Sequence, residues 1–204
     1  FYFFCKAAYA TAPKLLLFND GLAEELGLEP STLNSESGSA IFSGNVIPEG
    51  AHPLAQVYAG HQFGHFAGQL GDGRGMLLGE VLGKGKDSTL YDLHLKGAGK
   101  TPYSRGGDGR AVLRSSIREY LAGHFLSTCG VASSRSLGLV SSSTPVQRER
   151  METAAALLRV SDTHIRLGHF EWINAYGAST LTEFTDYVID RHFPELRELP
   201  EDSD

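Results

Sequence analysis

Residues 54–75, LAQVYAGHQFGHFAGQLGDGRG, form a long glycine-rich run, with glycines at positions 60, 64, 68, 71, 73 and 75. Such a segment is poor in both helix and strand propensity, because glycine loses more backbone entropy on ordering than any other residue. We therefore expect a compact loop whose backbone N–H groups approach a ligand closely. A second glycine-rich stretch, GAGKTPYSRGGDGR, covers residues 97–110.

The segment between these two stretches predicts an antiparallel β-hairpin. MLLGEVLG (76–83) is typical of a strand, GKGKDS (83–88) of a turn, and TLYDLHLK (89–96) of a second strand that ends at Lys96. The second strand alternates, which separates its side chains onto two faces, Tyr91, Leu93 and Leu95 on one and Asp92, His94 and Lys96 on the other.

The rest of the chain predicts a mixture of short helices and strands, so we expect an α+β fold. Residues 109–127 predict a helix with two distinct faces. The apolar face carries Leu113, Ile117, Leu121 and Phe125, and the other carries Arg110, Arg114 and Arg118. We also expect a short helix within 14–27, capped by Asn19 or Asp20 and ended by Gly27, and another helix over 178–192. Strands are expected at 131–140 and 151–160, and loops at 31–45 and 141–144.

Charge is distributed unevenly along a chain whose formal net charge is −6. Residues 96–166 carry eleven Lys and Arg against five Asp and Glu, a balance of +6, whereas 1–95 and 167–204 are acidic. A basic segment inside an acidic chain indicates a local anion as the ligand. It does not favour nucleic acid, because duplex-binding domains are usually basic overall. The absence of any run of eighteen apolar residues argues against a membrane span.

Three familiar motifs fail on inspection. GAGKT (97–101) resembles the end of a phosphate-binding P-loop, but the required first glycine is replaced by His94, and Pro102 removes a further N–H donor. The dinucleotide fingerprint G-x-G-x-x-G also fails, because Pro102 occupies the position that needs the third glycine after Gly97 and Gly99. In HQFGH (61–65) the glutamate of a zinc-protease motif is replaced by glutamine, so we predict no metal there. Cys5 and Cys129 are too few for a disulfide framework, and we expect ordinary thiols.

The order of the remaining parts is informative. A loop containing Gly71, Gly73 and Arg74 precedes the hairpin, Lys96 ends it, and Glu119 lies on the helix that follows. A strand lysine paired with a glutamate on the next helix positions ATP phosphates in protein kinases, because a lysine beside polyphosphate needs a carboxylate to fix its position and charge. On spacing alone, an unrelated surface lysine and helix glutamate remain an alternative.

Three segments, GHQFGHFAGQLGDGRG, LHLKGAGKTPYSRGGDGRAVLRSSIREYL and RVSDTHIRLGHFE, resemble the selenoprotein O family over about residues 14–195. The resemblance implies a protein-kinase-like fold in a pseudokinase that transfers AMP from ATP to Ser, Thr or Tyr hydroxyls of proteins, with pyrophosphate leaving. It also implies ATP and Mg²⁺ as cofactors. The implied division is an atypical or truncated start (1–13), an N-terminal extension (14–53), a kinase-like N-lobe with the phosphate clamp (54–170) and the start of a C-lobe (171–204).

Carried over position by position, the resemblance assigns a set of nucleotide-binding residues. Gly71, Gly73 and Arg74 would cover the phosphates, and Lys96 would bind them with Glu119 as its ion-pair partner. Nucleotide contacts are also implied for Asp108, Gly109, Arg159 and Arg166. Several cations are needed because a buried pyrophosphate group loses the water that solvates its charge.

The resemblance also implies parts that these 204 residues do not supply. The family's catalytic Asp and its metal-binding Asn and Asp are expected beyond residue 204, since no HGxxNTDN-like stretch occurs in 167–204, and the terminal Cys or selenocysteine is absent. We therefore expect the amino-terminal part of a longer enzyme, inactive by itself, and placed in mitochondria if eukaryotic or in the cytoplasm if bacterial. A non-catalytic nucleotide-binding module and a conventional kinase are the alternatives.

Overall fold

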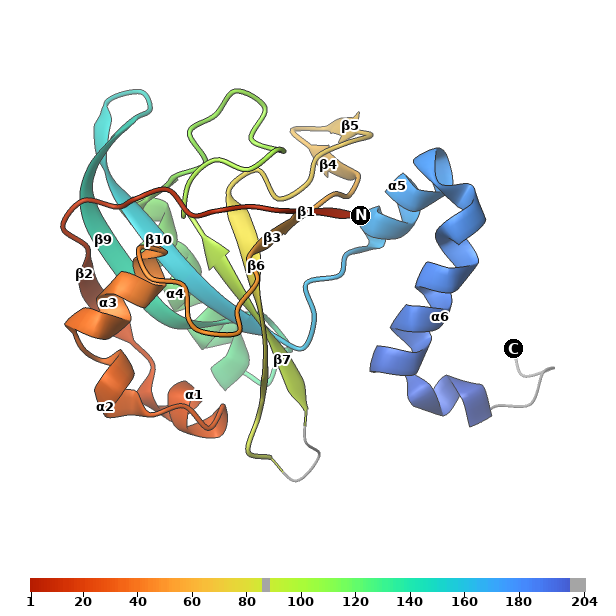
Figure 1. Ribbon diagram of the computed structural model, residues 1–204, viewed down its shortest axis with the longest axis horizontal. Coiled ribbons are helices and arrows are strands. Elements are labelled where there is room, and N and C mark those ends of the chain that lie inside the picture. The colour runs from red at the N-terminus through yellow and green to blue at the C-terminus, as the bar shows by residue number, and fades with distance from the viewer. Residues whose placement is uncertain (86–88, 199–204) are drawn as a thin grey trace. The chain divides into compact units, whose positions relative to one another are not determined.

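The computed structural model describes residues 1–85 and 89–198 (Figure 1). The chain forms two compact units, one made of residues 1–56 and 71–164 and the other of residues 57–70 and 165–204. The predicted turn at 83–88 falls partly on residues 86–88, which lie outside the described residues. The division predicted from the sequence, at 13/14, 53/54 and 170/171, stays a prediction.

The first unit is built on an antiparallel sheet with strand order β1-β3-β6-β7-β10-β9-β2, with β8 paired to β10 (Figure 1). The strands are β1 (Tyr2–Phe4), β2 (Lys14–Phe18), β3 (Leu54–Gln56), β6 (Gly75–Leu82), β7 (Leu90–Lys96), β8 (Ala111–Val112), β9 (Arg135–Gln147) and β10 (Met151–Ser161). The helices are α1 (Asp20–Glu25), α2 (Pro30–Leu33), α3 (Glu36–Ser43) and α4 (Leu113–Thr128). The predicted α+β class and the hairpin of β6 and β7 are confirmed.

Side-chain alternation along the strands gives the sheet two different faces. Alternate residues of β10 turn toward α1 and α3, where they join the main core around Phe42 and Leu95. The residues between them turn toward α4, where Leu157 packs with partly buried Tyr120. Because Leu95 belongs to the α1 and α3 face, its neighbours on β7 turn toward α4, and so does Arg159 on β10. The predicted polar face of residues 89–96 is therefore the face that α4 covers.

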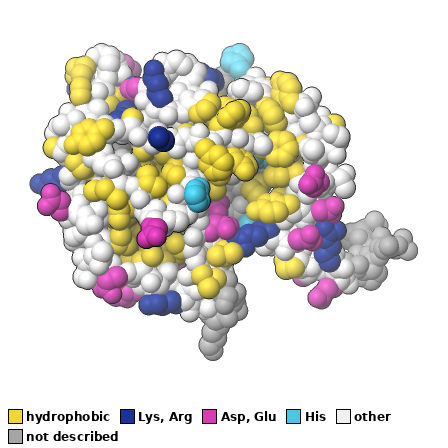
Figure 2. Space-filling view, viewed as in Figure 1, with side chains coloured by type: hydrophobic (Ala, Val, Ile, Leu, Met, Phe, Trp, Pro, Cys, Tyr) yellow, Lys and Arg dark blue, Asp and Glu magenta, His cyan; other side chains and the backbone are white. Residues whose placement is uncertain are grey.

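Helix α4 begins later than residue 109, because Ala111 and Val112 pair with β10 as strand β8. It packs through small residues: Ser116 is fully buried, and a Cβ at Gly123 would come 2.8 Å from the carbonyl oxygen of Ser134. The apolar row predicted from the sequence is left largely open, with Leu121 and Phe125 exposed at 56% and 66%. Apolar side chains are also exposed along β1, on the face viewed in Figure 2.

The short helix expected within 14–27 is confirmed at 20–25, where Asn19 caps it as predicted, whereas the strand at residues 14–18, which pairs with β9, was not expected. Three local expectations are wrong. The loop expected at 31–45 contains α2 and α3. Helix α3 forms in spite of its serines and glycine because Ser35 caps its start and left-handed Gly44 ends it. The loop expected at 141–144 is a continuation of β9, and the glycine-rich run contains short strands.

The second unit contains the hairpin of β4 (Gly60–Gln62) and β5 (His65–Ala67), then α5 (Leu167–Tyr176), the 3₁₀ turn η1 (Ala178–Thr180), α6 (Leu181–His192) and η2 (Pro194–Glu198). Phe63 and Gly64 form the hairpin turn with positive φ angles. Sequence reasoning predicted α6 but missed α5. A Cβ at Gly168 of α5 would come 1.9 Å from the Ala59 carbonyl oxygen, so only glycine allows this close approach.

Candidate functional site

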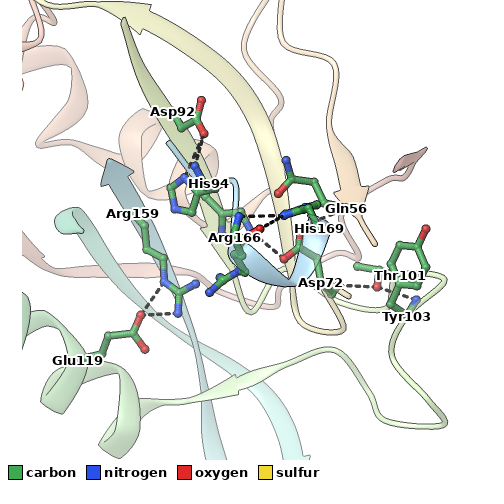
Figure 3. Close-up of polar contacts among 11 residues, drawn as sticks. Gln56, Asp72, Asp92, His94, Thr101, Tyr103, Glu119, Arg159, Arg166 and His169 are labelled. Carbon is green, nitrogen blue, oxygen red and sulfur yellow. Dashed lines mark hydrogen bonds and ion pairs between the residues drawn. The ribbon is translucent and has the colours of Figure 1, made fainter. Parts of the chain in front are cut away.

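Lys96, Glu119 and Arg159 form a cluster on the α4 face of the sheet. Lys96 is the last residue of β7, Arg159 lies on the neighbouring strand β10 opposite His94, and Glu119 reaches them from α4. The Glu119 carboxylate accepts a hydrogen bond from Lys96 Nζ through Oε2. Its Oε1 atom accepts from Arg159 Nε at 2.6 Å (Figure 3). One carboxylate therefore fixes two cations, and the sequence analysis had assigned it only one.

These three side chains are mostly but not wholly buried, with exposed fractions of 17% for Lys96, 30% for Glu119 and 18% for Arg159. Burial opposes ionisation of Glu119, but the neighbouring Arg159 and Lys96 outweigh it and hold its pKa below the ordinary range. Burial lowers the pKa of Lys96, and the charge of Arg159 lowers it further; Glu119 opposes this shift and Arg74 adds to it. The cluster therefore holds more positive charge than its single carboxylate neutralises.

The loop of residues 71–74 leads into β6 beside Lys96, since Gly75 is the strand partner of Lys96. Gly71 has a φ of +65°, and a Cβ there would lie 2.6 Å from the Tyr103 ring. A Cβ at Gly73 would lie 2.7 Å from the Tyr103 carbonyl oxygen. Both positions thus need glycine to pack the loop against residues 101–104. Arg74, the last residue of this loop, is exposed.

Asp108 and Gly109 hold a second tight turn. The Asp108 carboxylate accepts two hydrogen bonds from the Arg148 guanidinium, at 2.8 and 2.9 Å, and one from the Arg110 N–H at 2.9 Å. The bonds from Arg148 are the main reason why the pKa of Asp108 is lowered. Gly109 has a φ of +68°, and a Cβ there would lie 1.9 Å from the Gly99 carbonyl oxygen. Sequence reasoning missed Arg148, which lies forty residues from its partner.

Arg166, the last of the residues assigned from the sequence, belongs to the second unit. It precedes α5, and its N–H donates to His169 Nδ1 at 2.8 Å (Figure 3). Its guanidinium carbon lies 4.9 Å from the centre of the Tyr58 ring, within the range of a cation–π contact. The side chain is exposed.

Three of the backbone N–H groups of GAGKT are already bonded within the chain and do not face outward as in a phosphate loop. The N–H of Gly97 donates to the Arg74 carbonyl at 2.7 Å, and that of Gly99 donates to the Gly109 carbonyl at 3.2 Å. The N–H of Thr101 donates to Ser104 Oγ at 2.9 Å. This stretch instead connects the Arg74 loop to the Gly109 turn, so its glycines serve packing.

Within the described part of the chain, the side chains that could bind a metal ion are not gathered in one place. Across residues 1–85 and 89–198, no group of three or more His, Cys, Asp or Glu side chains is arranged to hold a metal ion. The described residues therefore do not form a Mg²⁺ site by themselves. Over the same part of the chain, no helix combines the length and apolarity needed to cross a membrane.

Comparison with known proteins gives a consistent result. A family model described as protein adenylyltransferase SelO matches residues 1–204. Relatives named protein nucleotidyltransferase YdiU are 50% identical over 91% of this chain in Rhizobium etli and 49% identical over 98% in Cereibacter sphaeroides. A third, from Sphingopyxis alaskensis, is 46% identical over 96% of the chain. The chain spans about two fifths of the length of these relatives, 37%, 42% and 40% respectively.

Proposed function

The chain belongs to the SelO family of protein adenylyltransferases, and we propose that it provides the ATP-phosphate clamp of such an enzyme, on a kinase-like N-lobe. The whole enzyme would transfer AMP from ATP to Ser, Thr or Tyr hydroxyls of other proteins. One observation carries the proposal: Glu119 fixes both Lys96 and Arg159, and Arg74 adds a further positive charge near Lys96.

The excess positive charge suits a polyphosphate. Two mostly buried cations share one carboxylate, and Arg74 adds positive charge near Lys96. Buried cations without full compensation are costly unless an anion joins them. A triphosphate offers several oxygens, and both lysine and arginine donate charge-assisted hydrogen bonds to phosphate. The planar guanidinium of Arg159 and the point charge of Lys96 differ in geometry, so together they would orient the group as well as hold it.

The proposed reaction is a substitution at the α-phosphorus of ATP. The hydroxyl oxygen of the protein substrate bonds to the α-phosphorus, the bond to the bridging oxygen of the β-phosphate breaks, and pyrophosphate leaves with the developing negative charge. Lys96, Arg159 and Arg74 would stabilise that charge, and the Asp108–Gly109 turn is proposed to add nucleotide contacts. A nucleotide contact of Arg166, in the second unit, stays a proposal from the family resemblance alone. None of these residues is assigned as the base that accepts the hydroxyl proton.

Calorimetric titration of this chain with ATP, with and without MgCl₂, tests the clamp. Lys96→Met should lower the affinity at least tenfold, the usual effect of losing a charged hydrogen bond to phosphate. Lys100→Met is the matched control, because Lys100 is an exposed lysine four residues away, and it should bind as the unaltered chain does. Equal affinities for the Lys96→Met and Lys100→Met variants would refute the clamp.

The reaction class is tested in a polypeptide that contains this chain and has the full length of the family's relatives. Protein substrates are incubated with ATP labelled at either the α- or the γ-phosphate. Retention of the α-label on protein supports AMP transfer. Retention of the γ-label alone would show phosphoryl transfer, as in a conventional kinase, and nucleotide binding without any retained label would favour a non-catalytic module.

A further inference from the structure

His94, the residue that breaks the P-loop pattern, lies in the first unit directly beneath the residue 71–74 loop. It is on β7 two residues before Lys96, on the same face, and its side chain is buried, with 1% exposed. A Cβ at Gly75 would lie 2.2 Å from His94 Cε1. The imidazole ring therefore fills the space under the point where the loop enters β6.

Asp72 links this ring to the loop. It stands between Gly71 and Gly73, and its carboxylate Oδ2 accepts a hydrogen bond from the Gln56 N–H at 3.0 Å. The Asp72 carbonyl accepts from the Thr101 hydroxyl at 2.7 Å (Figure 3). Its other carboxylate oxygen, Oδ1, lies 3.4 Å from His94 Nε2. Asp72 thus attaches the loop to Gln56 and to Thr101, and its carboxylate faces the His94 ring.

The His94 ring is held from its other side by His164. The two rings are stacked, with centroids 4.6 Å apart and planes at 14°. His164 is in turn fixed by Asp92, whose Oδ2 accepts the His164 backbone N–H at 2.6 Å and lies 3.4 Å from its Nδ1. The remaining charged neighbour is Arg159, on the strand beside β7. Burial lowers the pKa of His94 and outweighs the opposing effect of Asp72, which favours the neutral form of the ring.

A buried polar atom without a hydrogen bond calls for a physical reason. Among the described residues, neither ring nitrogen of His94 has a hydrogen-bond partner. The gap of 3.4 Å to Asp72 exceeds an ordinary N–H···O bond by about half an ångström. Asp72 Oδ1 is nevertheless the charged acceptor nearest to Nε2, so this long contact is the one by which the ring can hold the loop.

We propose that His94 is a positioning residue for nucleotide binding: its Nε2–H holds Asp72, and thereby the 71–74 loop with Arg74, in the position that contacts the phosphates. The inference rests on the proposed clamp but concerns residues that need not touch the nucleotide. It differs from a packing role, because packing requires only the ring, whereas positioning requires the donor atom.

Three substitutions separate the two roles. His94→Phe keeps the ring, its stacking and its contact with Gly75 but removes the donor. His94→Gln keeps a donor near the position of Nε2. His164→Phe is the matched control, because it keeps the stacked ring and removes only the contact with Asp92. Hydrogen exchange at the amides of residues 71–75 reports on the loop without nucleotide, and titration with ATP reports on binding.

We expect His94→Phe to bind ATP about tenfold more weakly and to exchange faster at residues 71–75, in line with the loss of one hydrogen bond to a charged group. His94→Gln should restore most of both properties, and His164→Phe should leave both within about twofold of the unaltered chain, a change below ~0.5 kcal/mol. If His94→Phe does not fold, Asp72→Ala in its place, which removes the acceptor, should give the same two losses.

Similar ATP affinity and exchange for folded His94→Phe and the unaltered chain would overturn the inference, as would equal losses in His94→Phe and His164→Phe. If the unaltered chain does not bind ATP but His94→Phe still exchanges faster at residues 71–75, the proposed function fails while the link between His94 and the loop stands.

Discussion

Glu119→Gln is the substitution that most directly probes the sharing of one carboxylate by two cations. It preserves the size of the side chain and removes the charge that neutralises Lys96 and Arg159. Breaking a fully buried ion pair on one side costs about 3–5 kcal/mol, and an exposed pair contributes about 0–1 kcal/mol. The exposed fractions of 17–30% place Glu119 between these limits. We expect a loss of about 2 kcal/mol in the free energy of unfolding.

Urea denaturation followed by circular dichroism measures this loss. With a denaturant slope of about 2 kcal/mol per molar, the midpoint of Glu119→Gln should fall by about 1 M. Glu25→Gln is the control, because Glu25 pairs with Arg135 on the surface and its side chain is 42% exposed; its midpoint should fall by less than about 0.5 M.

The dependence on pH gives a second check. Because the pKa of Glu119 is lowered in the folded chain, its contribution is complete above the ordinary glutamate pKa of about 4.3 and is lost as the pH falls through the folded value. The difference between the unaltered chain and Glu119→Gln should therefore shrink below about pH 4. A midpoint shift no larger than that of Glu25→Gln, or a difference that persists unchanged in acid, would refute the reasoning.

Three further outcomes follow from the same geometry. Gly71→Ala should lower the free energy of unfolding by about 2 kcal/mol or more, and Gly50→Ala by about 1 kcal/mol, because both adopt positive φ but only Gly71 faces a ring; equal losses in urea would contradict this. Arg159→Lys should lower ATP affinity about fivefold, since the charge remains but the guanidinium contact with Glu119 is lost; unchanged affinity in a titration would count against it. Burial lowers the pKa of His94 in the folded chain, so below about pH 6.5 the unfolded chain binds more protons and the free energy of unfolding should fall as the pH drops. His94→Phe should therefore make the urea midpoint less sensitive to pH between about 7.5 and 5.5. A variant with the same pH sensitivity as the unaltered chain would contradict this expectation.

The sequence predicted those parts of the fold in which local pattern and tertiary environment agree. The alternation of residues 89–96 was sufficient to place His94 and Lys96 on one face, and β6 and β7 form the predicted hairpin. The local sequence pattern did not predict segments whose backbone conformation depends on long-range pairing. Lys14–Phe18 is such a segment, since it is a strand because it pairs with β9. The pattern also failed at α3, because serine and glycine have low helix propensity and the caps that stabilise the helix are easily read as loop.

The candidate site divides in the same way. The order of residues along the chain left the pair of Lys96 and Glu119 open, the family resemblance implied it, and the structure places the two side chains in contact. The second partner of Glu119 and the contact between Arg148 and Asp108 each join residues forty positions apart, and no local pattern encodes such pairs. The sequence places His94 on the polar face of its strand and shows that it violates a motif, but gives it no role. Its burial beneath Gly75 depends on the register of β6 and β7, which the sequence does not specify.

The central claim is that Lys96, Arg159 and Arg74 bind the outer phosphates of ATP, and comparison of ATP with AMP tests it most directly. AMP carries the same base and sugar but lacks the β- and γ-phosphates. Calorimetric titration of the unaltered chain should show ATP binding at least tenfold more tightly than AMP, and Lys96→Met should abolish that difference, because a charged contact to phosphate accounts for about a factor of ten. Equal affinities of the unaltered chain for ATP and AMP, or a preference for ATP that survives in Lys96→Met, would contradict the account.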